Sequence, residues 1–339
     1  MDPVTQGIIG SVAASVGSSP HQRRQWALAG GLAGMAPDLD VLIRSSSDPL
    51  LFLEFHRHFT HSLFFIPFGA AAVAAVLSRF PKRFGSFKSL FLPCLLGLAT
   101  HGLLDACTSY GTNLFWPVSD TRVAWNSISI IDPIFTGLLG LGLLGTLRKE
   151  TTRWVRLGAL LGGFYLSFGF CQHERALDHQ EALATSRGHV VEDGEVKPSF
   201  GNNFLFRSFY QSGDTYFVDA IRLPWWGSVR VYPGSSIPRL DPQRFLAAHT
   251  LSPTQADDLG RFAHFSNGFL IADPHHDNVI GDLRYALVPN AIAPLWGIKW
   301  SATPSPAHTP FINFRGISNH HKSQFKSMLL GEEPAIRAE

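Results

Sequence analysis

The feature that most constrains this chain is a sharp division in hydropathy near residue 171. Before it the sequence is apolar and rich in glycine, and after it the sequence is mixed and polar. Six apolar segments occupy the first part: residues 4–17, 26–35, 62–77, 90–106, 128–147 and 154–171. A helix needs about 20 apolar residues to cross the hydrocarbon core, so the last three segments qualify and the third nearly does.

The first two apolar segments are too short for a full crossing and are dominated by glycine and alanine, as in Ala29-Gly30-Gly31-Leu32-Ala33-Gly34. Small residues at this spacing let helix backbones approach closely in lipid. We therefore predict an α-helical membrane bundle of about four full spans plus two short N-terminal apolar helices. A soluble, all-helical core is the alternative interpretation.

The polar remainder has a different pattern. Residues 177–187 could form a short helix, and residues 250–265 another. Segments 204–209, 215–223 and 227–232 are rich in aromatic and β-branched residues and are separated by turn-forming residues, which predicts strands. The expected domains are a helical membrane domain over 1–171, a small α+β soluble domain over 172–300 and a loosely ordered tail over 301–339.

Composition excludes several classes of protein. The formal net charge is only +2 and no lysine- or arginine-rich block occurs, so we expect no nucleic-acid partner. The chain has three cysteines, an odd number: Cys94, Cys107 and Cys171. They lie in apolar stretches and form no CxxC motif, which argues against a disulfide framework or a cysteine-based zinc site. The opening Met1-Asp2-Pro3 lacks the basic region of a signal peptide.

The distribution of basic residues predicts the orientation of the bundle. If each segment crosses or reaches across the membrane, one set of loops carries ten basic residues: Arg23, Arg24, Arg79, Lys82, Arg83, Lys88, Arg148, Lys149, Arg153 and Arg156. The opposite set carries only Arg44, Arg57 and Arg122. Cytoplasmic loops carry the excess of Lys and Arg, so both ends of the chain and the soluble domain should be extracytoplasmic.

Polar residues beside apolar helices need a reason, because ionisable groups are costly in lipid. Five such places occur: Gln6, Pro37-Asp38-Leu39-Asp40, the run from His56 to Ser62, His101 with Asp105, and Asp132. Each lies at the start of an odd-numbered segment or the end of an even-numbered one. The charge-based topology, built from Lys and Arg alone, therefore places all five at the same outer face.

Histidine and carboxylate side chains together are typical ligands of first-row metals. His101 and Asp105 are four residues apart and share one helix face. Our first-choice ligands are His61, His101 and Asp105, and the residues that complete the shell or bind a second ion are Asp38, Asp40, His56 and Asp132. The alternative is a polar network that only holds the bundle together.

At these residues the sequence resembles the YdjM family, whose members are described as LexA-binding, inner-membrane-associated, metal-dependent hydrolases. The resemblance covers roughly residues 1–170. It rests on the opening Met1–Gly7, Pro37–Asp40, His56–Ser62, His101 and Asp105, Thr108–Thr112, and Ile131-Asp132-Pro133. One departure matters, because the family usually has His where this chain has Gln6, and Gln is a poor ligand for transition metals.

The resemblance implies a hydrolase of the bacterial inner membrane that uses a divalent metal, zinc or else manganese. Asp40 is then the expected general base, and Arg57 is expected to hold an anionic group of the substrate. A site at the membrane face favours membrane lipid as a partner and a lipid-linked or phosphoester substrate. The competing hypothesis is a non-catalytic membrane protein with a structural metal and a soluble domain that binds a protein partner.

Overall fold

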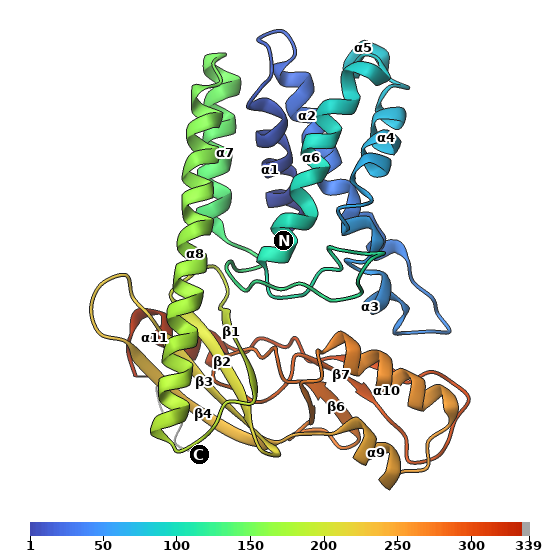
Figure 1. Cartoon of the computed structure of the whole chain (residues 1–339), viewed down its shortest axis with the longest axis vertical. Helices are drawn as coiled ribbons and strands as arrows, with labels where there is room; N and C mark the ends of the chain where they lie inside the picture. Colours follow the sequence, from blue (N-terminus) through green and yellow to red (C-terminus); the bar gives the residue numbers. More distant parts are fainter. Residues whose placement is uncertain (334–339) are drawn as a thin grey trace. The chain divides into compact units, whose positions relative to one another are not determined.

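The computed structural model describes residues 1–333 (Figure 1). The chain forms two compact units. The first contains Met1–Ile43, Phe55–Cys171 and Phe200–Asn203, and the second contains Arg44–Glu54, Gln172–Ser199 and the chain from Phe204 onward. We call them the helical unit and the sheet unit and describe each by itself.

The helical unit consists of helices joined by short turns and one long loop. Its elements are α1 (Pro3–Ser15), α2 (Arg23–Met35), η1 (Ala36–Leu42), η2 (Phe59–His61), α4 (Ile66–Leu77), α5 (Pro81–Phe84), α6 (Phe87–Cys107), α7 (Pro133–Lys149) and the first part of α8 (Arg153–Ser186). Helix α6 packs against α1, α2 and α4, and α1 also packs against α7. The short helix α3 (Leu51–Phe55) belongs to the sheet unit except for its last residue.

Two helices begin with the same pair of residues. Asp2-Pro3 starts α1 and Asp132-Pro133 starts α7, and each aspartate accepts hydrogen bonds from two backbone N–H groups of the first turn. An aspartate N-cap satisfies otherwise unpaired donors, and proline fits the first helical position because it lacks an N–H. These Asp-Pro pairs therefore fix where the two helices begin.

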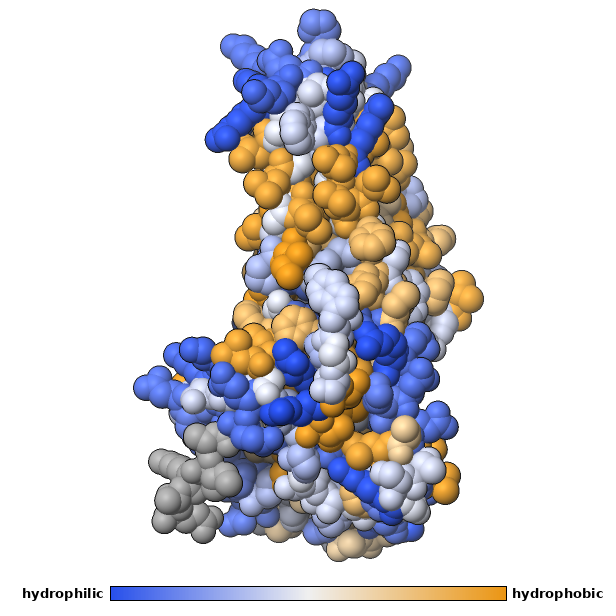
Figure 2. Space-filling model, turned by 90° about the vertical axis from the view of Figure 1, so that its left-hand side faces the viewer, coloured by the Kyte–Doolittle hydropathy of each residue, from blue (hydrophilic) through white to orange (hydrophobic). Residues whose placement is uncertain are grey.

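The expectation of four full spans is not supported. Among the described residues, α6 and α8 are long and apolar enough to cross a membrane, and a third span results if Leu51–His61 and Ile66–Leu77, bent by 88°, count as one. Helix α7 has 17 residues and a length of about 26 Å, short of a hydrocarbon core of about 30 Å. Figure 2 shows apolar side chains over the middle of the helical unit and a hydrophilic end above them.

Glycine lets the central helix approach its neighbours. A Cβ atom on Gly97 of α6 would lie 2.1 Å from the carbonyl oxygen of Gly30 in α2. A Cβ on Gly102 would lie 2.0 Å from the carbonyl oxygen of His61. Both positions need glycine because the neighbouring backbone occupies that space, which agrees with the close packing expected of small residues in lipid.

Helix α8 continues without a break from the helical unit into the sheet unit. The short helix expected over residues 177–187 is the last part of this 34-residue helix rather than an element of its own. The hydropathy change near residue 171 therefore marks a change of surroundings along one helix, and a hydropathy pattern alone does not separate this from a helix end.

The sheet unit contains two antiparallel four-stranded sheets. One has the order β1 (Asp193–Pro198), β2 (Leu205–Ser212), β3 (Thr215–Arg222) and β4 (Arg230–Pro238). The other has the order β5 (Leu270–Ala272), β6 (Val279–Asp282), β7 (Trp296–Lys299) and β8 (Phe311–Asn313). The expected α+β character of this part is present, with the three predicted strands close to β2, β3 and β4.

Three further helices belong to the sheet unit: α9 (Pro242–Ala248), α10 (Pro253–Phe265) and α11 (Asn319–Leu330). Helix α10 begins with a capping box in which Ser252 and Gln255 exchange hydrogen bonds. Where a loosely ordered tail was expected over residues 301–339, the structure places β8 and α11, and residues 334–339 lie outside the described residues. The capping box of Ser318 and His321 starts α11, and the buried Met328 packs it against the first sheet.

Candidate metal centre

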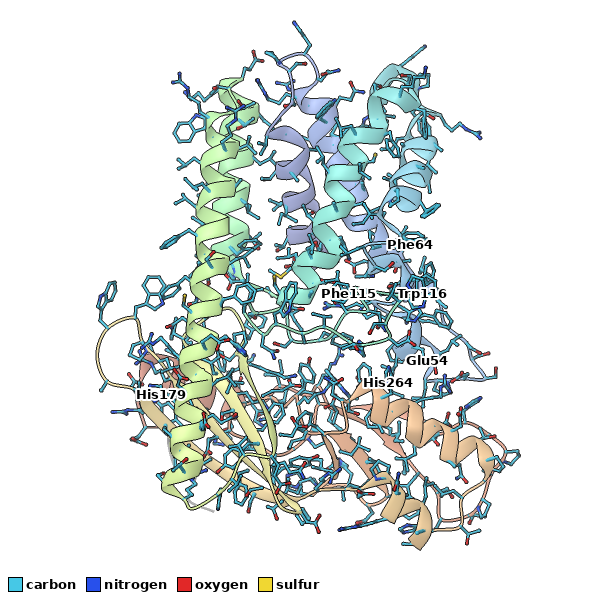
Figure 3. All side chains as sticks on the ribbon, in the orientation of Figure 1. Glu54, Phe64, Phe115, Trp116, His179 and His264 are labelled. Atoms are coloured by element: carbon cyan, nitrogen blue, oxygen red, sulfur yellow. The ribbon has the colours of Figure 1, made fainter. Side chains whose placement is uncertain are left out.

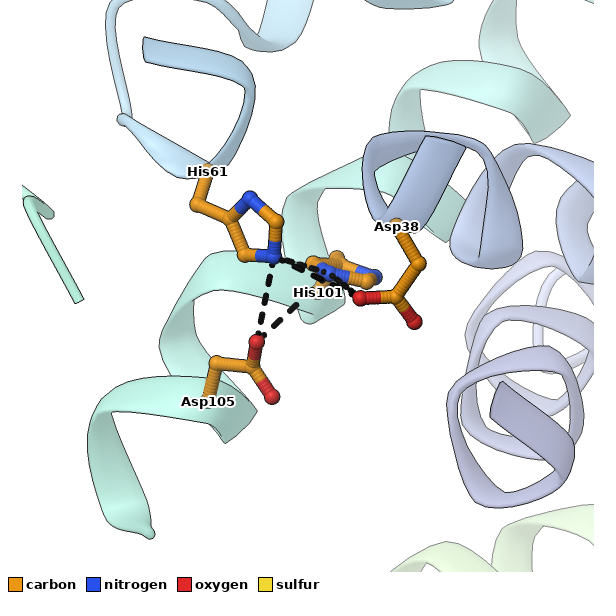
Figure 4. A group of neighbouring side chains, drawn as sticks. All are labelled: Asp38, His61, His101 and Asp105. Atoms are coloured by element: carbon orange, nitrogen blue, oxygen red, sulfur yellow. Dashed lines mark hydrogen bonds and ion pairs between the residues drawn. The ribbon is translucent and has the colours of Figure 1, made fainter. Parts of the chain in front are cut away.

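Four side chains from three separate segments converge within the helical unit (Figure 4). Asp38 comes from η1, His61 from η2, and His101 with Asp105 from α6. One ligand atom of each lies within 4.8 Å of the others. His61, His101 and Asp105 are buried and Asp38 is partly buried. We call these four residues the His/Asp centre.

Local structure explains how each segment reaches the centre. His101 and Asp105 are one turn apart on α6, so their side chains share a face. Pro37 lies in the first turn of η1, directly after α2 ends. It therefore places Asp38 just beyond the C-terminal end of α2. The absence of a side chain on Gly102 allows the η2 backbone, and with it His61, to lie against α6.

The hydrogen bonds at Nδ1 orient both imidazole rings. His101 Nδ1 lies 2.5 Å from the carbonyl oxygen of Gly34. His61 Nδ1 lies 3.3 Å from Asp40 Oδ2 and 3.0 Å from Thr60 Oγ1. A carbonyl or carboxylate partner favours the tautomer with the proton on Nδ1 and leaves the lone pair on Nε2. Both Nε2 atoms point into the centre, 2.8 Å from each other.

The distances fit a four-coordinate metal. His61 Nε2 lies 3.6 Å from Asp38 Oδ1 and 3.2 Å from Asp105 Oδ2. His101 Nε2 lies 3.5 Å and 3.7 Å from the same two oxygens. Ligand bonds of about 2.0–2.1 Å in a tetrahedron correspond to ligand–ligand distances of about 3.3–3.4 Å, close to these four values. The 2.8 Å between the two Nε2 atoms is shorter. The buried Asp105 Oδ2 makes no hydrogen bond among the described residues, but it forms an ion pair with the Arg57 side chain, whose Nε lies 3.2 Å away.

Asp40 organises the surroundings of the centre. Its carboxylate accepts hydrogen bonds from the Arg57 backbone N–H at 2.9 Å and from Thr60 Oγ1 at 3.0 Å, and it lies 2.8 Å from His56 Nδ1. Burial disfavours the charged form, but the hydrogen bonds with His56 and His61 outweigh it and hold the pKa of Asp40 below its ordinary value. The residue is therefore a charged acceptor that orients both histidines.

Arg57 lies inside the helical unit rather than at its surface. Its guanidinium Nε is 3.2 Å from Asp105 Oδ2, and its Nη1 donates to Thr108 Oγ1 at 2.9 Å. The guanidinium also lies 5.0 Å from the centre of the Tyr110 ring. Its backbone is left-handed, with φ of 63°, a conformation stabilised by the N–H bond to Asp40 and by the Asn113 N–H bond to the Arg57 carbonyl.

Gln6 contacts the centre from α1. Its Nε2 donates to Asp105 Oδ1 at 2.9 Å and to the carbonyl oxygen of His101 at 3.3 Å. The amino nitrogen of Met1 contacts the same Asp105 oxygen. The position where the family usually has histidine thus lies beside a candidate ligand.

The structure does not bring every candidate into the group of four. His56 lies beside it, held by Asp40. Asp132 caps α7 through Oδ1 and accepts a hydrogen bond from the Tyr165 hydroxyl through Oδ2 at 2.8 Å, so both oxygens have partners elsewhere. The sequence argument did not single out Tyr165, because a tyrosine within an apolar helix gives no local signal of such a role.

A second group of similar composition lies in the sheet unit, where Asp48, Asp258 and His308 place ligand atoms within 4.8 Å of one another. Arg261 lies among them and bonds to Asp48 at 2.8 Å and 3.1 Å, to Asp258 at 3.0 Å and to Glu54 at 2.5 Å. We call this the arginine-centred group. Its members are far apart in the sequence, and no motif connects them.

An aromatic segment lies at the same end of the helical unit as the centre. Phe115 and Trp116 belong to the loop between α6 and α7, and Phe64 follows η2 (Figure 3). The Trp116 ring lies 5.4 Å from His58 and 6.2 Å from Phe59. Phe64 and Phe115 are exposed, as are Leu39 and Leu42 of η1.

Comparison with known proteins supports the family suggested by the motifs. A model of the YdjM inner membrane protein family matches residues 1–176, which includes the whole His/Asp centre. An uncharacterized protein of Bacillus subtilis (strain 168), YfhP, is 27% identical over 165 residues. The match covers 48% of this chain and 50% of that relative, so the chain spans about half the length of the curated relative it matches. No solved structure matches. Since the family model covers more than half of the residues and all of the shared motifs, the chain belongs to the YdjM inner membrane protein family.

Proposed function

We propose that this protein is a membrane-bound, metal-dependent hydrolase whose divalent ion is held by Asp38, His61, His101 and Asp105. The observation that carries the proposal is the pair of buried imidazoles whose Nε2 atoms face each other, 2.8 Å apart, between two carboxylates. Two lone pairs in that position repel unless a proton or a metal cation lies between them, and zinc or manganese accepts this combination of ligands. Such an ion supplies Lewis acidity and activates water for hydrolysis.

We place proton transfer on His56 rather than on Asp40. Asp40 is fully engaged as an acceptor, whereas the His56 side chain is 20% exposed and has its Nδ1 fixed by that carboxylate. A carboxylate at Nδ1 orients the ring and favours the tautomer with a free lone pair on Nε2, which is the arrangement a general base requires. Arg57 pairs with Asp105 and orients it through their 3.2 Å contact, and the burial of Arg57 makes it a poor first contact for substrate.

We propose a lipid-linked or phosphoester substrate. The centre lies next to exposed apolar side chains on η1 and around η2: Leu39, Leu42, Leu63, Phe64 and Phe115. A polar, soluble substrate gains little from contact with these apolar side chains, whereas a lipid tail can pack against them. The basic loops between α1 and α2, between α4 and α6, and between α7 and α8 lie at the opposite end of the helical unit (Figure 1). We therefore place the centre at the extracytoplasmic face.

Hydrolysis of phosphodiester and phospholipid substrates by the purified full-length protein, in detergent with zinc or manganese, tests this function. His56→Gln should lower the rate about 100-fold or more while metal content is retained, since general acid–base groups contribute about 10²–10⁴-fold. His58→Gln is the matched control, because His58 is only two residues from His56 in the sequence and its ring packs on Trp116. Equal rates for the two variants would remove His56 from the mechanism.

The same experiment separates the catalytic proposal from a structural metal. If the ion only stabilises the fold, His101→Ala should reduce yield and thermal stability, because metal binding is then coupled to folding. If it is catalytic, the variant should insert and fold but lose hydrolysis. A folded, metal-loaded wild-type protein that is inactive on the whole panel would favour a non-catalytic protein that binds a protein partner.

A further inference from the structure

A pocket opens at the basic end of the helical unit, opposite the His/Asp centre. It has a volume of about 230 Å³ and lies between the turn that joins α1 to α2 and the end of α7. The residues around it are Pro20, His21, Arg23, Arg24, Leu147 and Glu150. Its position is independent of the proposed hydrolase site.

Arg23 is the unusual residue of this pocket. Its relative exposure is 5%, and the structure records neither a hydrogen bond nor an ion pair between its guanidinium and any residue from 1 to 333. Its buried Nε atom has no acceptor within this part of the chain. A buried guanidinium nitrogen without an acceptor is unfavourable, so the surroundings of Arg23 favour an anion from outside the described residues.

The backbone supports the same conclusion. Arg23 is the first residue of the 13-residue helix α2, and the preceding Gln22 forms no side-chain cap. The Gln22 side chain instead accepts a hydrogen bond from Ser19. The first N–H groups of a helix lack internal partners and carry the positive end of its dipole, which favours an anion at that position. The buried guanidinium nitrogen and the uncapped helix start therefore both favour an anion near Arg23.

The charges at the pocket indicate which anion fits. Arg23 and Arg24 provide two guanidinium groups and Glu150 one carboxylate, which leaves a single net positive charge apart from His21. A phosphodiester carries one negative charge, and guanidinium groups bind phosphate oxygens through paired hydrogen bonds.

A neighbouring apolar groove favours a lipid as the source of the phosphate. It has a volume of about 400 Å³ and lies between α7 and α8, with leucines along most of its length and Arg148, Lys149 and Trp154 among its residues. Leu147 and Glu150 of the pocket are the sequence neighbours of Arg148 and Lys149. We propose that the pocket binds the phosphate of an anionic phospholipid in the leaflet at this end of the bundle, with Arg23 as the principal contact and the groove beside it for the acyl chains.

Thermal unfolding of the delipidated full-length protein in detergent tests this site. The probes are phosphatidylglycerol, phosphatidylcholine and inorganic phosphate, each titrated against the melting temperature, because a ligand bound to the native state raises it. Wild type should be stabilised saturably by phosphatidylglycerol and much less by the other two. Phosphate that stabilises as strongly as the lipid would overturn the lipid assignment.

Three variants make the assignment to this pocket specific. Arg23→Gln should weaken phosphatidylglycerol binding at least 10-fold, whereas Arg79→Gln, which removes an exposed charge from the same end, should change it less than twofold. Glu150→Gln removes the opposing carboxylate from an exposed position and should strengthen binding severalfold, so a gain of affinity supports the site even if Arg23→Gln does not fold. Unchanged affinity in both Arg23→Gln and Glu150→Gln would contradict the proposal.

Discussion

The helical unit and the sheet unit each bring histidine and aspartate side chains within metal-binding distance, but they surround them differently. In the arginine-centred group, Arg261 bonds directly to both Asp48 and Asp258, and His308 Nδ1 lies 2.9 Å from Asp258. In the His/Asp centre, two imidazole Nε2 atoms converge on each other and on Asp38, and none of these three groups meets a guanidinium among the described residues.

This difference teaches that distance alone does not define a metal site. The arginine-centred group already contains its cation, so an added metal would have to displace a well-bonded guanidinium. Arg57 contacts only Asp105 of the His/Asp centre, and the histidine tautomers fixed by Gly34 and Asp40 leave lone pairs directed inward. We therefore expect a metal in the His/Asp centre and none in the arginine-centred group.

The largest expected effect is the loss of metal binding. His101→Ala removes a ligand from the centre of the group and should reduce bound zinc or manganese to background in the purified protein. His308→Ala is the matched control, because it removes a histidine from the arginine-centred group and should leave the metal content unchanged. Elemental analysis by mass spectrometry measures both, and equal loss in the two variants would end the distinction between the groups.

The next effect concerns the stability of the sheet unit. Arg261→Ala leaves the fully buried Asp258 carboxylate without its guanidinium partner, and breaking such a buried pair costs about 3 kcal/mol or more. The control Arg244→Ala breaks an exposed pair with Asp214 and should change the stability little, because solvent screens such pairs. Denaturant unfolding followed by a probe in the sheet unit compares them. A small effect of Arg261→Ala would show that the guanidinium is not the cation of its group.

A smaller effect is expected where the ligands themselves are unchanged. Asp40→Asn removes the carboxylate that orients His61, and loss of such an outer partner lowers metal affinity about 10–100-fold. Asp132→Asn is its counterpart in the same unit, and since Asn also caps helices well it should preserve both α7 and the metal affinity. Metal competition titrations measure the two affinities. Weaker binding in Asp132→Asn would return that residue to the list of ligands.

Gln6→His should raise the affinity for the metal, whereas Asp40→Asn should lower it. Gln6 Nε2 lies 2.9 Å from Asp105, so a histidine there could add a nitrogen ligand and raise affinity on the order of tenfold, about 1.4 kcal/mol. The same titration detects the change. Unaltered affinity would place position 6 outside the coordination shell.

The smallest effect is a pH dependence confined to the sheet unit. The hydrogen bond to Asp258 raises the pKa of His308 above its ordinary value of 6.5. The folded state therefore binds this proton more tightly than the unfolded state, so the stabilisation is complete below pH 6.5 and is lost as the pH rises through the higher folded-state pKa. Melting curves from pH 6 to 9 should show this decline in wild type and a flatter profile in His308→Asn.

Much of the His/Asp centre could be predicted from the sequence because its residues stand at the ends of apolar helices, where a charged group needs an explanation. The His101 and Asp105 pair follows from helical spacing alone. The placement of Asp132 did not follow, because the Asp-Pro pattern of a helix cap looks the same as a ligand until the partner Tyr165 is known. The role of Asp40 depended on the turn around Arg57, which has no sequence signature.

The fold shows the same limit. Apolar composition identified the helical unit, but composition does not distinguish a 17-residue helix from a full span. Nor does it distinguish a long helix that becomes polar partway along from a helix that ends at that point. The arginine-centred group joins residues about 200 positions apart, and no local pattern could have connected Asp48 to Arg261.

X-ray absorption spectroscopy of the zinc-loaded full-length protein, together with its metal stoichiometry, tests the central claim most directly. The account predicts one ion per chain, bound only by nitrogen and oxygen at about 2.0–2.1 Å, with the scattering pattern of two imidazoles. Failure to retain zinc after dialysis, or a spectrum without imidazole ligands, would contradict the His/Asp centre as a metal site.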